Sequence, residues 1–364
     1  MNIVMPFINI DNGEPTINPE HKLRISLSER AALTMANDMD VFGIDKKTTF
    51  LNQVFSNYRD DAKASISLYL EHRKEELSQM LHGTELNSKD KISVIDHLLQ
   101  AEQKELINQA NQYFKLPKAS KKENNYHINK NNFLYLTEDC NEEEYYNYQA
   151  GKYVRAVFEE YCSLPFIKRE RIFRKDLYDI VEQACKEHRL LKVDAIRNNV
   201  KLIIYVYPYK IISDPLDTQS YLVCYTRLKD EDESSKRIAS FNMARMNLPK
   251  MLKAKAVLSK GEIDEIHNRL ATESPAYFLG NSTTIKVRLT EKGIASYNAR
   301  LYSRPEKIDS LSSSNVYVFD CTPMQAYNYF FPFGDQCEIL EPEFLRVRFQ
   351  ETMQKTLSLY NKKG

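Results

Sequence analysis

Residues 198–246 constrain the fold of this chain more than any other stretch, because three consecutive runs alternate in the manner of β-strands. Period-two spacing puts four residues of the second run on one face of a pleated strand: Tyr221, Val223, Tyr225 and Arg227. In the third run a shared face holds Arg237, Ala239, Phe241, Met243 and Arg245. Polar, turn-rich segments separate the runs, so the pattern predicts three strands of one antiparallel sheet.

Tyrosine and arginine on the same strands suit a single-stranded nucleic acid, because rings stack on bases and guanidinium groups bind phosphate. The candidate nucleic-acid-binding residues are Tyr209, Tyr221, Tyr225, Arg227, Arg237 and Arg245. A second interpretation stays open. Aromatic residues favour strands for packing reasons alone, so the tyrosines can instead fill the core of a small barrel.

This region resembles the WYL domain, a small Sm-like (SH3-type) barrel found in bacterial regulators and in CRISPR-associated proteins. The resemblance rests on Pro208-Tyr209, on Tyr221-Leu222 and on the run Phe241-Asn242-Met243-Ala244-Arg245-Met246. Ser220 stands where the family usually has tryptophan, and Ala244 where it usually has an acidic residue. A helical segment at 153–173 and the stretch 333–360 extend the resemblance over about residues 130–364.

Composition places the chain among globular proteins of two or three domains. It has 364 residues, of which 42% are apolar and 28% charged, and its net charge of +1 neither favours nor excludes nucleic acid. The longest apolar run is too short for a membrane span, and residues 1–4 lack the character of a secretory signal. Six cysteines form no CxxC pair, which favours reduced thiols. We therefore expect a cytoplasmic protein.

The N-terminal region predicts one strand followed by two helices. Residues 22–28 alternate, with Lys22, Arg24 and Ser26 on the polar face, and helices are expected over 29–42 and from an Asp45 cap to residue 58. This order resembles a ribbon-helix-helix unit, in which two chains pair their lone strands, so the resemblance implies a homodimer. The polar face then enters the major groove of DNA. Alternatively, the unit serves only for dimerisation.

We expect an α+β multidomain chain with four parts. Residues 1–60 form the ribbon-helix-helix unit, and 61–130 form a helical connector that ends in a basic linker at 115–130. Residues 131–260 hold a helical segment and the WYL barrel. Residues 261–364 form a ferredoxin-like α+β extension with strands near 284–289, 315–319 and 337–340 and helices near 291–300, 326–331 and 343–361. In WYL proteins this extension often contacts a second subunit.

The sequence contains no motif that indicates catalysis. It has no glycine-rich phosphate loop, no GxSxG, and no HxxxH or HExxH spacing among its seven histidines. We expect no catalytic residue, no metal site and no cofactor.

A WYL barrel joined to a ribbon-helix-helix unit resembles the accessory proteins of type VI-D CRISPR systems. The resemblance implies a non-enzymatic protein that binds single-stranded RNA and enhances an RNA-guided ribonuclease effector. One alternative is a dimeric, ligand-responsive transcriptional regulator that binds duplex operator DNA through Lys22 and Arg24. Another is an assembly protein whose basic runs are incidental.

Overall fold

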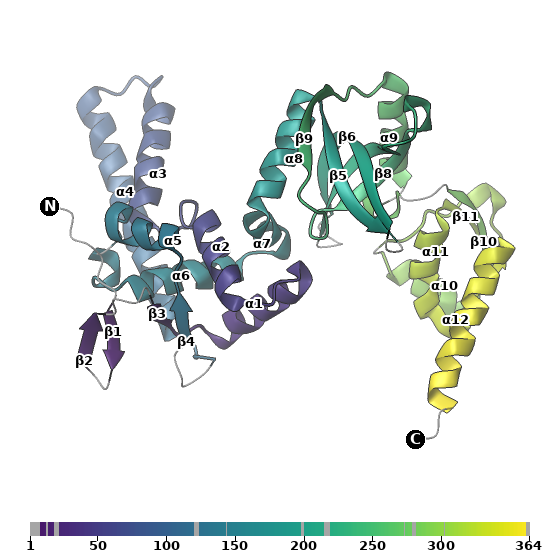
Figure 1. Ribbon diagram of the computed structural model, residues 1–364, viewed down its shortest axis with the longest axis horizontal. Helices are drawn as coiled ribbons and strands as arrows, with labels where there is room; N and C mark the ends of the chain where they lie inside the picture. Colours follow the sequence, from purple (N-terminus) through teal and green to yellow (C-terminus); the bar gives the residue numbers. More distant parts are fainter. Residues whose placement is uncertain are drawn as a thin grey trace. The chain divides into compact units, whose positions relative to one another are not determined.

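The computed structural model describes residues 8–11, 14–17, 22–119, 124–142, 144–197, 200–214, 219–272, 274–278, 282–301 and 303–361. The chain divides into two compact units, residues 1–175 and 176–364, which are described separately below. Helices and antiparallel sheets occur in both units, so the predicted α+β class is confirmed (Figure 1).

The centre of the first unit is α6 (Ala150–Ser163), in which residues 153–162 are all buried. A helix covered on every side must also satisfy its polar groups internally. Glu159 accepts hydrogen bonds from the backbone nitrogen of Ser28 at 2.7 Å and from its hydroxyl at 2.6 Å. Glu160 accepts from the Tyr58 hydroxyl and from the backbone nitrogen of Ala64, each at 2.8 Å. These two carboxylates tie α6 to segments more than 90 residues away in the sequence.

The predicted strand and two helices are present as β3 (Lys22–Ile25), α1 (Glu29–Phe42) and α2 (Lys47–Tyr58). Gly43 ends α1 at φ 67°, as expected for a C-terminal cap. The N-cap position of α2 is Lys46 and not the predicted Asp45, and the Lys46 side chain makes no capping hydrogen bond. The finer prediction of a ribbon-helix-helix unit is not confirmed.

The expectation of a lone strand at residues 22–28 is wrong. β3 pairs antiparallel with β4 (Asn124–His127) of the same chain, and Leu23 lies opposite Tyr126. The segment 115–130 was expected to be a linker, and it supplies this partner; residues 120–123 of that segment lie outside the described residues. Because one edge of β3 is satisfied within the chain, edge pairing no longer requires a second chain.

Two long helices of the first unit, α3 (Ile66–Leu81) and α4 (Ser88–Lys115), pack as a hairpin (Figure 1). Its remaining elements are β1 (Ile8–Asp11), β2 (Glu14–Ile17), α5 (Lys130–Leu134), the π-helical turn η1 (Tyr135–Asp139), η2 (Glu144–Tyr146) and α7 (Phe166–Phe173).

The second unit begins with a five-stranded antiparallel sheet in the order β8-β7-β6-β5-β9. Its strands are β5 (Arg189–Arg197), β6 (Val200–Asp214), β7 (Gln219–Leu228), β8 (Arg237–Asn242) and β9 (Lys250–Lys255). The three strands predicted within 198–246 are β6, β7 and β8. Within the described residues β8 and β9 do not pair, so the sheet is open and the predicted Sm-like barrel is not confirmed.

A helix covers each face of this sheet: α8 (Lys175–Glu187) on one side and α9 (Lys260–Thr272) on the other (Figure 1). The alternation predicted for β7 is confirmed. Leu222 and Cys224 pack in the core with α8, whereas Val223 and Tyr225 pack in the core with Ile266 of α9.

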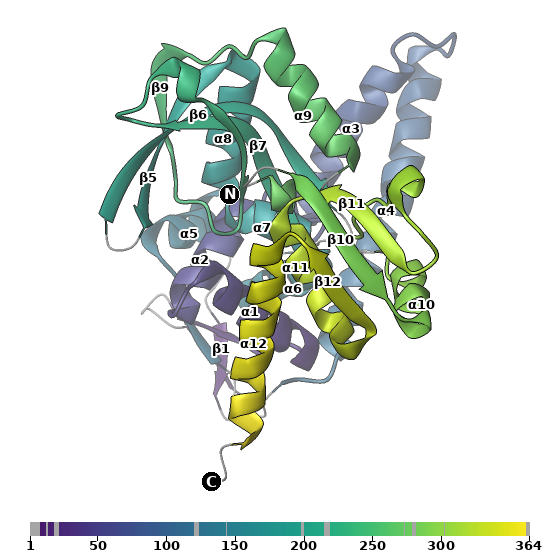
Figure 2. The same cartoon turned by 90° about the vertical axis from the view of Figure 1, so that its right-hand side faces the viewer.

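The C-terminal part forms a three-stranded antiparallel sheet in the order β11-β10-β12. Its elements are β10 (Thr283–Leu289), α10 (Glu291–Ala299), η5 (Asp309–Leu311), β11 (Val316–Cys321), α11 (Pro323–Phe330), η6 (Phe331–Gln336), β12 (Cys337–Glu341) and α12 (Glu343–Asn361). Figure 2 shows α12 beside β12 and α11.

The strands and helices predicted for 284–361 match these elements closely. The ferredoxin-like prediction is wrong, because that pattern has four strands in the order βαββαβ and the described residues form three. Across the described part of the chain, every helix is too short or too polar to cross a bilayer.

Candidate nucleic-acid interface

The hydroxyl groups of the three tyrosines predicted to bind nucleic acid form hydrogen bonds with other residues of the second unit. Tyr225 is 3% exposed, and its hydroxyl donates to Glu265 of α9. Tyr221 is 7% exposed, and its hydroxyl donates to Gln219 at 2.7 Å. Tyr209 is half-buried, with its hydroxyl 2.7 Å from Nε2 of His267. Burial also raises the pKa of Tyr225, and Glu265 raises it further. These contacts favour the packing interpretation that the sequence left open.

Helix α9 is the reason that the tyrosine-bearing face is covered. It starts with a capping box, since the backbone nitrogen of Ser259 donates to the Glu262 carboxylate at 2.7 Å and the backbone nitrogen of Glu262 donates to the Ser259 hydroxyl at 3.3 Å. Ile266, one turn later, is fully buried against the sheet. Sequence reasoning missed this helix, although Ser259-x-x-Glu262 before apolar residues 263, 266 and 270 was a usable signal.

Arg227 and Arg237 both contact Glu231 in the connection between β7 and β8. Arg227 is 15% exposed, and its guanidinium lies 4.8 Å from the centre of the Tyr205 ring. It donates to the Tyr207 hydroxyl at 3.0 Å and to the backbone oxygen of Glu231 at 2.8 Å. Arg237 is 59% exposed and lies 3.4 Å from the Glu231 carboxylate. Glu231 therefore links these two predicted residues, through its backbone oxygen and its carboxylate.

Arg245 lies at the other end of β8, in the turn that follows the strand, and its side chain is exposed. Tyr221 is near this end as well, since it pairs with Asn242. Five residues of extended chain separate the two ends of β8, which amounts to about 17 Å. The six candidate residues thus form two clusters, with Arg227 and Arg237 in one and Tyr221 and Arg245 in the other.

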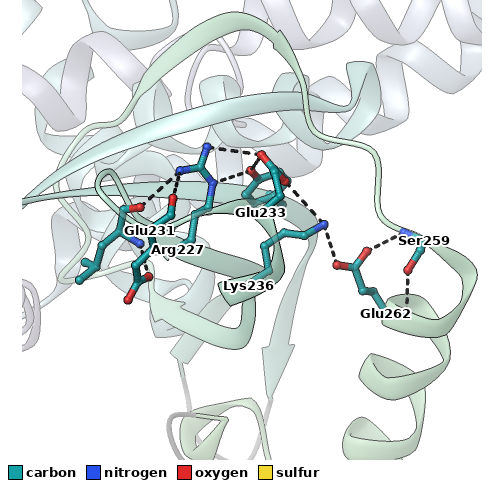
Figure 3. A network of polar contacts seen from close by, with 8 residues as sticks. Arg227, Glu231, Glu233, Lys236, Ser259 and Glu262 are labelled. Carbon is teal, nitrogen blue, oxygen red and sulfur yellow. Dashed lines mark hydrogen bonds and ion pairs between the residues drawn. The ribbon is translucent and has the colours of Figure 1, made fainter.

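A polar network joins the β7–β8 connection to the start of α9 (Figure 3). Glu233 accepts from the Tyr207 hydroxyl at 2.6 Å and lies 3.4 Å from Arg227. Lys236 lies 2.7 Å from Glu262 and 3.9 Å from Glu233. Burial acts to raise the pKa of Glu262, but the contacts with Lys236 and Ser259 outweigh it and lower that pKa. Sequence reasoning missed this network, whose signal was four consecutive acidic residues at 230–233.

The N-terminal candidates belong to the first unit. Leu23 and Ile25, on the face opposite the predicted polar face, are buried, and Lys22 and Arg24 are half-buried on β3. Ser26 is only 9% exposed, which disfavours direct contact with DNA, and its role as a DNA-contacting residue stays a prediction. The reason for its burial is local: the chain leaves β3 after Ile25 and runs inward to the buried Ser28, whose hydroxyl caps α1.

Residues 168–175, Lys-Arg-Glu-Arg-Ile-Phe-Arg-Lys, form a basic run that is partly structural. Arg169 binds Asp38 through two contacts, at 2.7 and 3.0 Å, and Asp38 is only 1% exposed. This arginine therefore serves the core of the first unit.

Comparison with known proteins shows an extensive likeness to a solved structure. No family model and no curated protein matches the chain. A solved structure described as "Crystal structure of a CRISPR Cas-related protein" is similar over 100% of this chain and 99% of its own, with a TM-score of 0.71 and 20% identity. A second, proteasome accessory factor B/C (PafBC) of Arthrobacter aurescens, covers 59% of this chain and 33% of its own at a TM-score of 0.29 and 16% identity, too distant to support an inference. The first likeness shows a shared fold.

Proposed function

We propose that this chain is a non-enzymatic accessory protein of a CRISPR system, and that it binds single-stranded RNA through arginines at the two ends of β8. The observation that carries the proposal is the fold shared, over the whole chain, with a protein described as CRISPR Cas-related. The WYL-like motifs of the sequence support it independently. The finer part of the proposal is that the protein enhances the RNA-guided ribonuclease of a type VI system.

The chemistry of the site favours the phosphate backbone over the bases. Arg237 and Arg245 are exposed, and guanidinium groups bind phosphate oxygens through paired hydrogen bonds. The buried tyrosines instead hold the strands that carry these arginines. Binding of this kind is salt-dependent and depends little on base sequence.

The test is binding of labelled single-stranded RNA, single-stranded DNA and duplex DNA to the whole protein across a salt series. In R237A/R245A, which removes both exposed guanidinium groups, we expect RNA affinity to fall about tenfold or more at low salt. The matched control is K286A/R288A, which removes the same charge from β10, where Glu341 and Glu338 pair with these side chains. The control is expected to leave RNA affinity nearly unchanged.

Unchanged RNA affinity in a folded R237A/R245A protein would remove the proposed site. Strong duplex binding that depends on Lys22 and Arg24 would favour the transcriptional regulator. The effector role has its own assay, target-RNA cleavage by a type VI ribonuclease with and without this protein. The enhancement is expected to be lost with R237A/R245A.

A further inference from the structure

The connection between β7 and β8 carries an unusual concentration of negative charge next to the proposed RNA-binding arginines. Residues 230–233 are Asp-Glu-Asp-Glu, and Arg227, Lys236 and Arg237 flank them in the sequence. We call residues 229–236 the acidic loop.

Two carboxylates of the acidic loop form ion pairs with nearby cationic side chains. Glu231 lies 3.4 Å from Arg237, and Glu233 lies 3.4 Å from Arg227 and 3.9 Å from Lys236. Carboxylate and phosphate oxygens bind a guanidinium group through the same donors. A phosphate of RNA must therefore displace these carboxylates to reach the same atoms.

The loop is anchored, so its carboxylates remain close to the arginines. The Glu231 carboxylate also accepts from the backbone nitrogen of Leu228 at 2.7 Å. Glu233 accepts from the Tyr207 hydroxyl at 2.6 Å, and Lys236 joins the loop to Glu262 of α9 at 2.7 Å (Figure 3). Each contact reduces the freedom of the loop to move aside.

We propose that the acidic loop is an autoinhibitory element, which competes with RNA phosphates for Arg227 and Arg237. It thereby limits the RNA affinity of the site formed by the arginines at the two ends of β8, which we call the β8 site. This inference rests on the proposed function and adds a regulatory part to it. The side chain of Arg237 is 59% exposed, and an ion pair at such an exposed arginine is individually weak, which allows RNA to displace Glu231.

The loop provides its own matched control. Asp230 and Asp232 are exposed, and within the described residues neither forms an ion pair with the arginines. E231Q/E233Q and D230N/D232N therefore remove equal charge from the same loop. Only the first pair removes the carboxylates that contact Arg227 and Arg237, and glutamine retains an oxygen that can accept from Tyr207 and Leu228.

The experiment measures the affinity of the whole wild-type protein and both double variants for a labelled single-stranded RNA, at low and at high salt. We expect E231Q/E233Q to bind about three- to tenfold more tightly than wild type at low salt, with a smaller gain at high salt because screening weakens the competition. D230N/D232N is expected to gain clearly less. Thermal unfolding of each variant reports any loss of structure.

The outcomes separate this inference from the proposed function. If wild type binds RNA and the two variants gain equally, or E231Q/E233Q gains nothing, the autoinhibitory role is overturned while RNA binding stands. If RNA binds only to E231Q/E233Q, both ideas are supported and the inhibition is strong. If no RNA binds to any of the three proteins, the proposed function fails and the inhibition fails with it.

Discussion

Tyr225 and Arg245 both belong to the sequence pattern that suggested a nucleic-acid surface. Their exposure differs, so only one of the two side chains is available to a ligand. Tyr225 is 3% exposed beneath α9, whereas the side chain of Arg245 is exposed. Alternation predicts which face of a strand a residue occupies, and this was confirmed for Val223 and Tyr225. It does not predict what covers that face, because the covering helix lies 30 or more residues further along the chain. Residue-level roles therefore required the structure.

Gly293 of α10 lies close to the backbone of Gln336. A Cβ atom built there would lie 2.3 Å from the backbone oxygen of Gln336, closer than real contacts allow. We expect G293A to lower the free energy of unfolding by about 1–3 kcal/mol, because backbone must shift to admit the methyl group. Chemical denaturation measures this.

The control for that prediction is Gly261, near the start of α9, where an added Cβ meets nothing within 4 Å. Alanine there should leave stability unchanged or raise it by up to about 1 kcal/mol, because alanine favours helix. Equal effects of the two substitutions would contradict the steric account of Gly293.

At the scale of elements, the helices and strands with a long periodic apolar pattern were predictable from the sequence, and those without one were not. Long alternating or helical patterns of apolar residues in the sequence predict strands β6, β7 and β8 and the C-terminal elements. Strand β4 is only Asn-Asn-Tyr-His, four residues with little apolar pattern, and its pairing with β3 spans about 100 residues of sequence. Such a pairing depends on tertiary contacts. For this reason the sequence alone makes β3 look like an unpaired strand.

The start of α9 gives a prediction of pH dependence. Contacts with Lys236 and Ser259 lower the pKa of Glu262 below its usual value of 4.5 in the folded protein, although burial acts in the opposite direction. Its contribution to stability is therefore present above that value and is lost as the pH falls through the lowered pKa. E262Q, which keeps a capping-box side chain, should be less stable than wild type at neutral pH by no more than about 1 kcal/mol.

Thermal unfolding of both proteins between pH 7 and pH 3 tests this account. The difference between them should shrink in the acidic range. A difference that stays constant at every pH would show that the ionised carboxylate is not what stabilises the helix.

At the scale of the whole molecule, each of the two units has its own buried centre. The first is built around α6, and the second contains separate cores on the two faces of the large sheet and one in the C-terminal sheet. Composition predicted two or three domains. The finer boundaries at 60, 130 and 260 stay predictions, and so does the homodimer.

Independent cores predict independent folding. A fragment of residues 176–364 should be folded, with a cooperative thermal transition and a far-ultraviolet circular dichroism spectrum typical of mixed α and β structure. It should also keep the RNA affinity of the full chain, because the β8 site lies entirely within it. Loss of RNA binding by a folded fragment would place essential contacts in residues 1–175.

The acidic loop has a consequence for which RNA molecules the protein would hold. A carboxylate attached to the chain acts as a resident competitor at high effective concentration, which a single mononucleotide cannot match. A long strand that reaches both ends of β8 re-binds at one end while the other is displaced, so its contacts add up. On the proposed function, the protein would then select its ligand by length and ignore the pool of free nucleotides around it.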